Sequence, residues 1–150
     1  YDKNNPKWKK PNWEKSKQKE KNRDSIIDGV PIALPALHRS RRIQEKAASV
    51  GFDWEKKEQV LDKLDEEVKE LKDAINKNEG IEEELGDVLF TVVNLSRHLN
   101  YNPETALKSS INKFSKRFKR IEKDLKQKNI NMKDLSLREL DKIWDKNKKK

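Results

Sequence analysis

The sequence predicts an all-α fold, a bundle of four to five helices, and three observations support this prediction. Apolar residues recur every three to four positions through long segments, which is the spacing of one face of a helix. Proline, glycine and capping side chains stand at the ends of these segments, where helices start and stop. No segment shows the strict apolar–polar alternation of a half-buried strand.

The chain begins with a segment that differs from the rest. Residues 1–24 are rich in Lys and Asn and can bury little, so we expect a flexible basic segment. Over residues 25–35, two prolines and a glycine prevent a long helix, while five aliphatic side chains can pack along a surface. We therefore expect an extended arm over 25–35, at the start of a domain that occupies 25–150.

The first long helix is predicted over 35–50. Pro35 suits the first helical position, and Gly51 ends the pattern. Its buried side is expected to hold Leu37, Ile43, Ala47 and Val50. We interpret His38 as an ordinary polar side chain, because no partner motif accompanies it.

Two further helices are predicted over 54–78 and 81–99. Asp53 can cap the first of them, and Gly80 separates the two. The apolar stripe over 54–78 comprises Leu61, Leu64, Val68, Leu71 and Ile75. The stripe over 81–99 comprises Ile81, Leu85, Val88, Val92, Leu95 and Leu99.

The C-terminal third predicts one long helix and one short one. Asn102 and Pro103 are typical of a helix start, and the helix is expected over 103–128. Its apolar set is Leu107, Ile111, Phe114, Phe118, Ile121 and Leu125. Ser136 and Glu139 form a capping box for a last helix that ends near Trp144.

Composition limits the size of the core. The 150 residues suit one domain, but only 32% are hydrophobic, so we expect either long tails or a core that a second copy completes. Cysteine is absent, which fits a reducing cytoplasm, and no apolar run is long enough to span a membrane. Because the first residue is Tyr, we expect the chain to be part of a longer protein.

The net charge of +9 is unevenly distributed. Residues 1–24 carry +5, residues 25–107 carry −6, and residues 108–150 carry +10. The acidic middle argues against a nucleic-acid polymer as ligand, because a phosphate backbone prefers a continuous basic surface. An acidic centre beside a basic third fits a metal ion and a polyphosphate better.

Four acids in the middle form two similar pairs. Glu67 and Glu70, and likewise Glu84 and Asp87, are three residues apart, so each pair can share one helix face. In each pair the first acid lies at the edge of the predicted apolar stripe. If the two helices pack antiparallel, the four can converge on one Mg²⁺ or Mn²⁺ ion, since hard ions prefer oxygen ligands. The alternative is that these acids only solvate two exposed helices.

Other charged residues fit this site less directly or complement it. Glu66, Glu82 and Glu83 are weaker metal ligands by the same helical geometry. Lys113 and Arg117 are four residues apart on one predicted helix face, and an Arg can bind phosphate oxygens through two hydrogen bonds. Surface charge without a ligand is the alternative for this basic pair.

The acidic motifs resemble a known family. Glu-Glu-Val-Lys-Glu at 66–70 and Glu-Leu-Gly-Asp at 84–87 resemble the signature of the all-α nucleoside triphosphate (NTP) pyrophosphohydrolases, and among them MazG. The resemblance covers residues 25–146, and it is closest at 34–37, 51–54, 84–90, 93–95 and 112–118. The chain looks like the C-terminal domain of MazG, with residues 1–24 as the basic inter-domain segment and the N-terminal domain missing.

The resemblance implies a function and a set of site residues. The family hydrolyses NTPs and dNTPs to NMP and pyrophosphate, removing unwanted nucleotides, and works as a homodimer or larger assembly. The metal ligands and catalytic acids implied for Mg²⁺ are Glu67, Glu70, Glu84 and Asp87. The substrate-binding residues implied are Lys63, Glu83, Lys113, Arg117 and Trp144. Trp144 as a core anchor is the alternative for that residue.

Two other functions stay open at this stage. The chain can be a catalytically silent dimerisation or regulatory module of a tandem MazG protein, or a basic helical nucleic-acid binder. The sequence does not indicate the base and sugar preference, the number of metals or the order of the oligomer. It also leaves open which acid positions the attacking water, with Glu66 and Glu83 as candidates.

Overall fold

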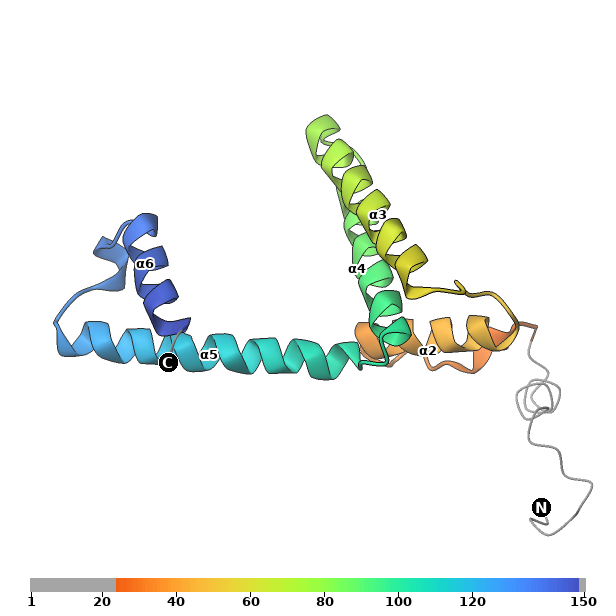
Figure 1. Ribbon diagram of the computed structural model, residues 1–150, viewed down its shortest axis with the longest axis horizontal. Helices are drawn as coiled ribbons and strands as arrows, with labels where there is room; N and C mark the ends of the chain where they lie inside the picture. Colours follow the sequence, from red (N-terminus) through yellow and green to blue (C-terminus); the bar gives the residue numbers. More distant parts are fainter. Residues whose placement is uncertain (1–23, 149–150) are drawn as a thin grey trace, which may run out of the picture. The chain divides into compact units, whose positions relative to one another are not determined.

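The structure is a computed structural model and describes residues 24–148 of the chain (Figure 1). Throughout these residues the regular secondary structure is helical, with five α-helices and two short 3-10 helices, so the all-α prediction is confirmed. The described residues form two compact units, and the second begins at Glu104. The segment expected to be flexible, 1–24, lies almost wholly outside the described residues. Between residues 24 and 148, no helix is long and apolar enough to cross a membrane.

The first unit opens with a 3-10 helix, η2 (Ile26–Gly29). The Ser25 hydroxyl accepts a hydrogen bond from the Ile27 amide at 3.3 Å, and Asp28 accepts one from the Ser25 amide at 3.0 Å. The expected extended arm over 25–35 is therefore wrong, and a turn follows the 3-10 helix, in which the Leu34 amide donates to the Pro31 carbonyl at 3.3 Å. The reciprocal capping pair of Ser25 and Asp28 stabilises a local helical turn instead.

Helix α2 (Ala36–Ser49) follows Pro35 and ends before Gly51, whose φ of 91° suits glycine. Gln44 is buried on α2, and its side-chain amide donates a hydrogen bond to the Phe90 carbonyl at 2.9 Å. This bond links α2 to α4, the helix on which it packs. Val50, predicted to be buried, is 57% exposed because the helix has already ended.

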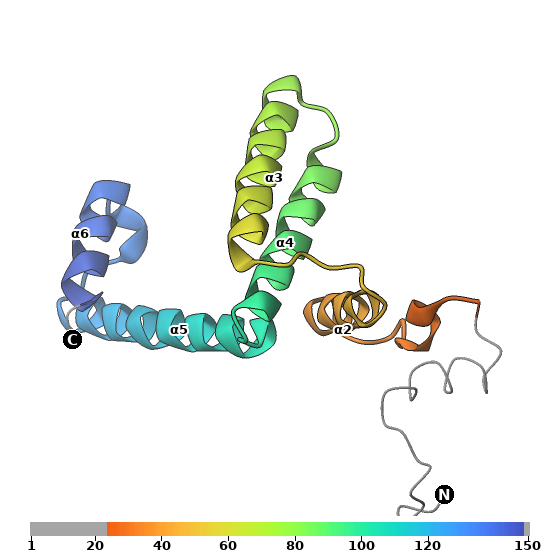
Figure 2. The ribbon, with the colours of Figure 1, turned by 45° about the vertical axis from the view of Figure 1, so that its right-hand side comes forward.

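Helices α3 (Lys57–Lys77) and α4 (Ile81–His98) form an antiparallel hairpin (Figures 1 and 2). The turn between them uses two left-handed residues, Asn78 with φ 52° and Gly80 with φ 69°. This hairpin is the main helix–helix contact of the first unit. The antiparallel packing that the metal prediction requires is thus present.

The predicted cap of α3 was wrong. Asp53 lies before the helix, and its carboxylate binds α4 instead, as described below. The helix starts at Lys57, and the Gln59 side chain accepts hydrogen bonds from the amides of Glu55 at 3.1 Å and Lys56 at 3.0 Å. Gln59 therefore satisfies the amides that an Asp cap would have bound.

The buried line of the hairpin differs from the predicted stripes. On α3 the buried residues are Val60, Glu67 and Ala74, whereas Leu61 and Ile75 are about half exposed. On α4, several predicted stripe members, Leu85 and Val92 among them, are also exposed. Two helices bury only a narrow line between them, and here that line is shifted from the apolar stripes. As a result, an acid, Glu67, lies in the contact.

The second unit contains α5 (Pro103–Gln127), η3 (Met132–Asp134) and α6 (Leu137–Lys148). The capping box of α6 is confirmed, because Ser136 and Glu139 exchange two hydrogen bonds of 3.2 Å. The helix continues past Trp144 to Lys148, so the predicted end was too early. Of the predicted apolar set on α5, Ile121 and Leu125 are buried, and the four members nearer the start of the helix are exposed.

Candidate metal and nucleotide site

Three of the four predicted metal ligands meet on the α3–α4 hairpin. One carboxylate oxygen each from Glu67, Glu84 and Asp87 lies within 4.8 Å of the others. Glu67 comes from α3, while Glu84 and Asp87 come from one face of α4. Glu67 lies 17 positions before Glu84 in the chain, and the two share one site because the hairpin is antiparallel (Figure 2).

Two of these acids each have a buried carboxylate oxygen. Glu67 is only 7% exposed. Its Oε2 atom and the Oε2 atom of Glu84 are both buried without a hydrogen-bond partner among the described residues. A buried carboxylate oxygen without a donor is costly. A hard divalent cation would satisfy both atoms, and the all-oxygen donor set fits such an ion.

Glu70 lies beside this cluster but is not one of its three members. It is exposed on α3. The negative charge of Glu67 raises its pKa above the usual value, with further contributions from desolvation and from the charge of Glu84. Glu70 is therefore a fourth acid at the edge of the cluster, where it interacts with the negative charges of Glu67 and Glu84.

Lys63 is the cation next to the cluster. Its Nζ atom lies 3.1 Å from Glu67 Oε1 and 3.5 Å from Glu66 Oε1. The hydrogen bond to Glu67 raises the pKa of Lys63, so the side chain stays charged. Glu83, predicted to bind substrate, is exposed on α4 outside the three-acid group.

The other predicted site residues lie in the second unit, where an aromatic cluster forms between α5 and α6. The guanidinium carbon of Arg117 lies 5.6 Å from the ring centroid of Trp144, within cation–π range. Phe114 lies 5.2 Å from Trp144 and 5.9 Å from Phe118, centroid to centroid. Lys113 is exposed on α5 one turn before Arg117. The sequence placed Phe114 in an apolar stripe and missed its contact with Trp144.

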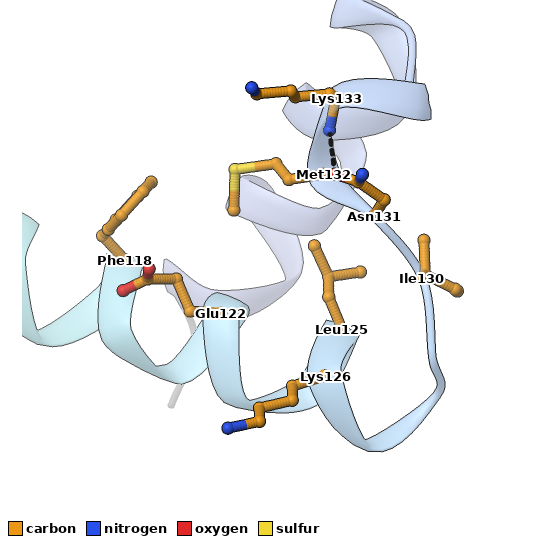
Figure 3. Close-up of a pocket in the computed structure, with 8 residues that line it drawn as sticks. All are labelled: Phe118, Glu122, Leu125, Lys126, Ile130, Asn131, Met132 and Lys133. Atoms are coloured by element: carbon orange, nitrogen blue, oxygen red, sulfur yellow. Dashed lines mark hydrogen bonds between the residues drawn. The ribbon is translucent and has the colours of Figure 1, made fainter.

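The second unit also has an open pocket between α5 and the segment that leads into η3 (Figure 3). Phe118, Leu125, Ile130 and Met132 give it a largely apolar lining, and the Asn131 side chain accepts a hydrogen bond from the Lys133 amide at 3.1 Å. None of the predicted site residues lines this pocket. It therefore does not form part of the candidate site.

The sequence also missed a charged cluster that joins the loop before α3 to the end of α4. Arg97 Nη1 donates to Asp53 Oδ2 at 3.1 Å, and His98 Nε2 lies 2.9 Å from Asp53 Oδ1. Asn94 Oδ1 accepts from Arg97 Nη2 at 2.8 Å, which orients the guanidinium. Each partner lies more than 40 positions from Asp53, so no local pattern indicated the contact.

Part of the chain matches a known protein family. Residues 55–122 match the MazG nucleotide pyrophosphohydrolase domain. The matched segment contains all four predicted metal-binding acids and the pair Lys113 and Arg117.

Individual relatives extend the similarity over most of the chain. The nucleoside triphosphate pyrophosphohydrolase/pyrophosphatase MazG of Thermotoga maritima is 45% identical over 138 residues, which is 91% of this chain and 54% of the relative. The nucleoside triphosphate pyrophosphohydrolase of Escherichia coli K12 is 37% identical over 139 residues, 88% of this chain and 53% of the relative. The chain thus spans about half the length of these relatives. Residues 55–122 thus carry a MazG nucleotide pyrophosphohydrolase domain, and most of the chain is similar to relatives named as nucleoside triphosphate pyrophosphohydrolases.

Proposed function

We propose that this chain is a Mg²⁺-dependent nucleoside triphosphate pyrophosphohydrolase, which cleaves NTPs and dNTPs to NMP and pyrophosphate. The observation that carries the proposal is the convergence of Glu67, Glu84 and Asp87, two of which have a buried oxygen with no hydrogen-bond partner among residues 24–148. The names of the Thermotoga and Escherichia relatives, which are nucleoside triphosphate pyrophosphohydrolases, support it.

Four acids would hold the ion. Glu67, Glu84 and Asp87 would be the inner ligands, and Glu70 at the edge of the cluster would complete the set. Bound Mg²⁺ supplies positive charge that offsets the negative phosphate oxygens and lowers the cost of bringing a triphosphate to an acidic surface. Mn²⁺ has the same preference for oxygen ligands and is expected to substitute.

Three residues of the second unit would bind the nucleotide. Arg117 would bind phosphate oxygens through its planar guanidinium, and Lys113 would add a second positive charge. The ring of Trp144 offers a stacking surface for a base. The resemblance to the family also implies Lys63 and Glu83 of the first unit as substrate-binding residues.

The protein is proposed to act as a homodimer or larger homo-oligomer. Large apolar side chains are exposed in both units. They include Leu85, Leu89, Phe90 and Val92 on α4, and Leu107, Ile111 and Phe114 on α5. A second copy would remove this surface from water.

Incubation of the 150-residue protein with a panel of NTPs and dNTPs, with and without Mg²⁺, tests the function. We expect the wild type to release nucleoside monophosphates and pyrophosphate. Glu67→Gln and Asp87→Asn should release neither product. Asp65→Asn, which removes one charge from the exposed face of α3, should keep wild-type activity. A folded wild-type protein that releases no pyrophosphate from any nucleotide would favour a silent dimerisation module.

A further inference from the structure

The contact between Lys63 and Glu67 bears on how the acidic cluster takes up a metal ion. Glu67 is the most buried of the three clustered acids, and its side chain is 9% exposed. Of its two oxygens, Oε1 lies 3.1 Å from Lys63 Nζ, while Oε2 is buried and has no hydrogen-bond partner in the part of the chain that the structure describes. One half of this carboxylate is therefore already bound to a cation from its own helix.

We propose that Lys63 is a built-in cation that competes with the divalent metal for Glu67, so that metal binding requires Lys63 to leave. This inference rests on the proposed metal site.

The position of Lys63 allows this exchange. It lies four residues before Glu67 on α3, and its side chain is 35% exposed, so the ammonium has room to move toward solvent. Its weaker second contact, to Glu66 Oε1 at 3.5 Å, lies at a more exposed carboxylate, 58% exposed against 9% for Glu67. Lys63 can thus keep an anionic neighbour after it releases Glu67.

The charges in the cluster give the exchange its direction. Glu67, Glu84 and Asp87 place three carboxylates close together, and the Lys63 ammonium contacts Glu67. A single positive charge offsets this repulsion only in part, whereas a divalent ion can contact all three acids at once. A triphosphate would provide a new anionic partner for the displaced ammonium, so metal and nucleotide would favour each other's binding.

The effect of removing Lys63 on metal affinity distinguishes competition from a purely structural role. If the lysine only held Glu67 in the right rotamer, its removal would loosen the site and weaken metal binding. If it competes, its removal strengthens metal binding while it destabilises the metal-free protein, because Glu67 then stays buried without a cation.

The test measures Mn²⁺ binding to the full chain by titration calorimetry without nucleotide. It compares wild type, Lys63→Met, Lys63→Arg and Lys69→Met. Lys69 is exposed on the same helix and has no described contact with the cluster, so its variant controls for the loss of one charge. We expect Lys63→Met to bind Mn²⁺ about three- to tenfold more tightly than both wild type and Lys69→Met. Lys63→Arg should stay close to wild type.

Thermal unfolding supplies the second measurement. Lys63→Met should melt below wild type without metal and gain more in melting temperature when Mn²⁺ is added. Unchanged or weaker Mn²⁺ binding in Lys63→Met would overturn the competition, and the proposed function would stand if the wild type releases pyrophosphate. Absence of Mn²⁺ binding in all four proteins, together with no pyrophosphate release, would overturn both.

Discussion

Asp53 and Arg97 form a two-pronged ion pair across 44 positions of the chain, with both carboxylate oxygens accepting from the guanidinium. The side chains are 25% and 16% exposed, respectively, so the pair is partly shielded from water. His98 adds a third contact to the same carboxylate. The pair fixes the loop that leads into α3 against the end of α4, and thereby the hairpin that carries the acidic cluster.

Asp53→Asn should therefore destabilise the protein. The substitution removes the charge that Arg97 and His98 share, and we expect a loss of about 1–2 kcal/mol in the free energy of unfolding. Urea unfolding followed by circular dichroism measures this loss. Asp65→Asn, which removes an exposed carboxylate of the same charge, should lose less than about 0.5 kcal/mol. Equal stability of the two variants would contradict the role given to the pair.

The same pair predicts an acid limit on stability. The hydrogen bond from Arg97 is the main cause that lowers the pKa of Asp53 below its usual value of 3.8 in the folded protein. The unfolded chain therefore takes up the proton first as pH falls. The stabilising contribution is complete above the unfolded pKa and is lost as pH falls through the lower, folded pKa. The stability difference between wild type and Asp53→Asn should shrink as the pH falls below about pH 4.

The acidic cluster should oppose folding when no metal is bound. One carboxylate oxygen each of Glu67, Glu84 and Asp87 lies within 4.8 Å of the others, and like charges at this distance repel one another. The charges of Glu67 and Glu84 also raise the pKa of Glu70. Glu84→Gln should consequently raise the melting temperature of the metal-free protein and abolish the increase that Mg²⁺ gives to wild type. Glu82→Gln is the matched control, since it also removes a charge from the first turn of α4. If Glu84→Gln melts lower than this control without metal, the repulsion is not the dominant effect.

Local signals in the sequence predicted the helices well but not the contacts between them. Gly80, Pro103 and the Ser136–Glu139 pair act within one turn of chain, and the helices bounded by them start where expected. The spacing of Glu84 and Asp87 likewise fixes one helix face. Which line of α3 is buried depends on α4, so the placement of Glu67 in the contact was not predictable from the α3 stripe. Asp53 illustrates the same limit, because its carboxylate binds the distant Arg97 and does not cap α3.

Arg117 offers a test of the nucleotide contacts that does not change the net charge. Its guanidinium lies over the Trp144 ring, and a lysine keeps the charge but loses the planar group that stacks and forms paired hydrogen bonds. Arg117→Lys should raise KM for the nucleotide about tenfold with a smaller change in kcat. Lys119 is exposed on the same helix, and Lys119→Arg, which also keeps the charge, should leave both constants unchanged. An unaltered KM in Arg117→Lys would mean that Arg117 does not bind the nucleotide and is only a surface charge of α5.

Self-association should depend on α4. Leu85, Leu89 and Val92 follow one another at three- and four-residue steps and are 47%, 54% and 41% exposed, so they form a continuous apolar row on one helix face. A charge in the middle of this row would have to be buried if a second copy covers it, and Leu89→Lys should therefore convert an oligomer into single chains. Ile32→Lys is the matched control, because Ile32 is 81% exposed and lies outside any helix. Sedimentation velocity measures the result. A wild-type protein that sediments as a single chain at all concentrations would contradict the oligomer, and dissociation by both variants would mean that the row on α4 is not the specific contact.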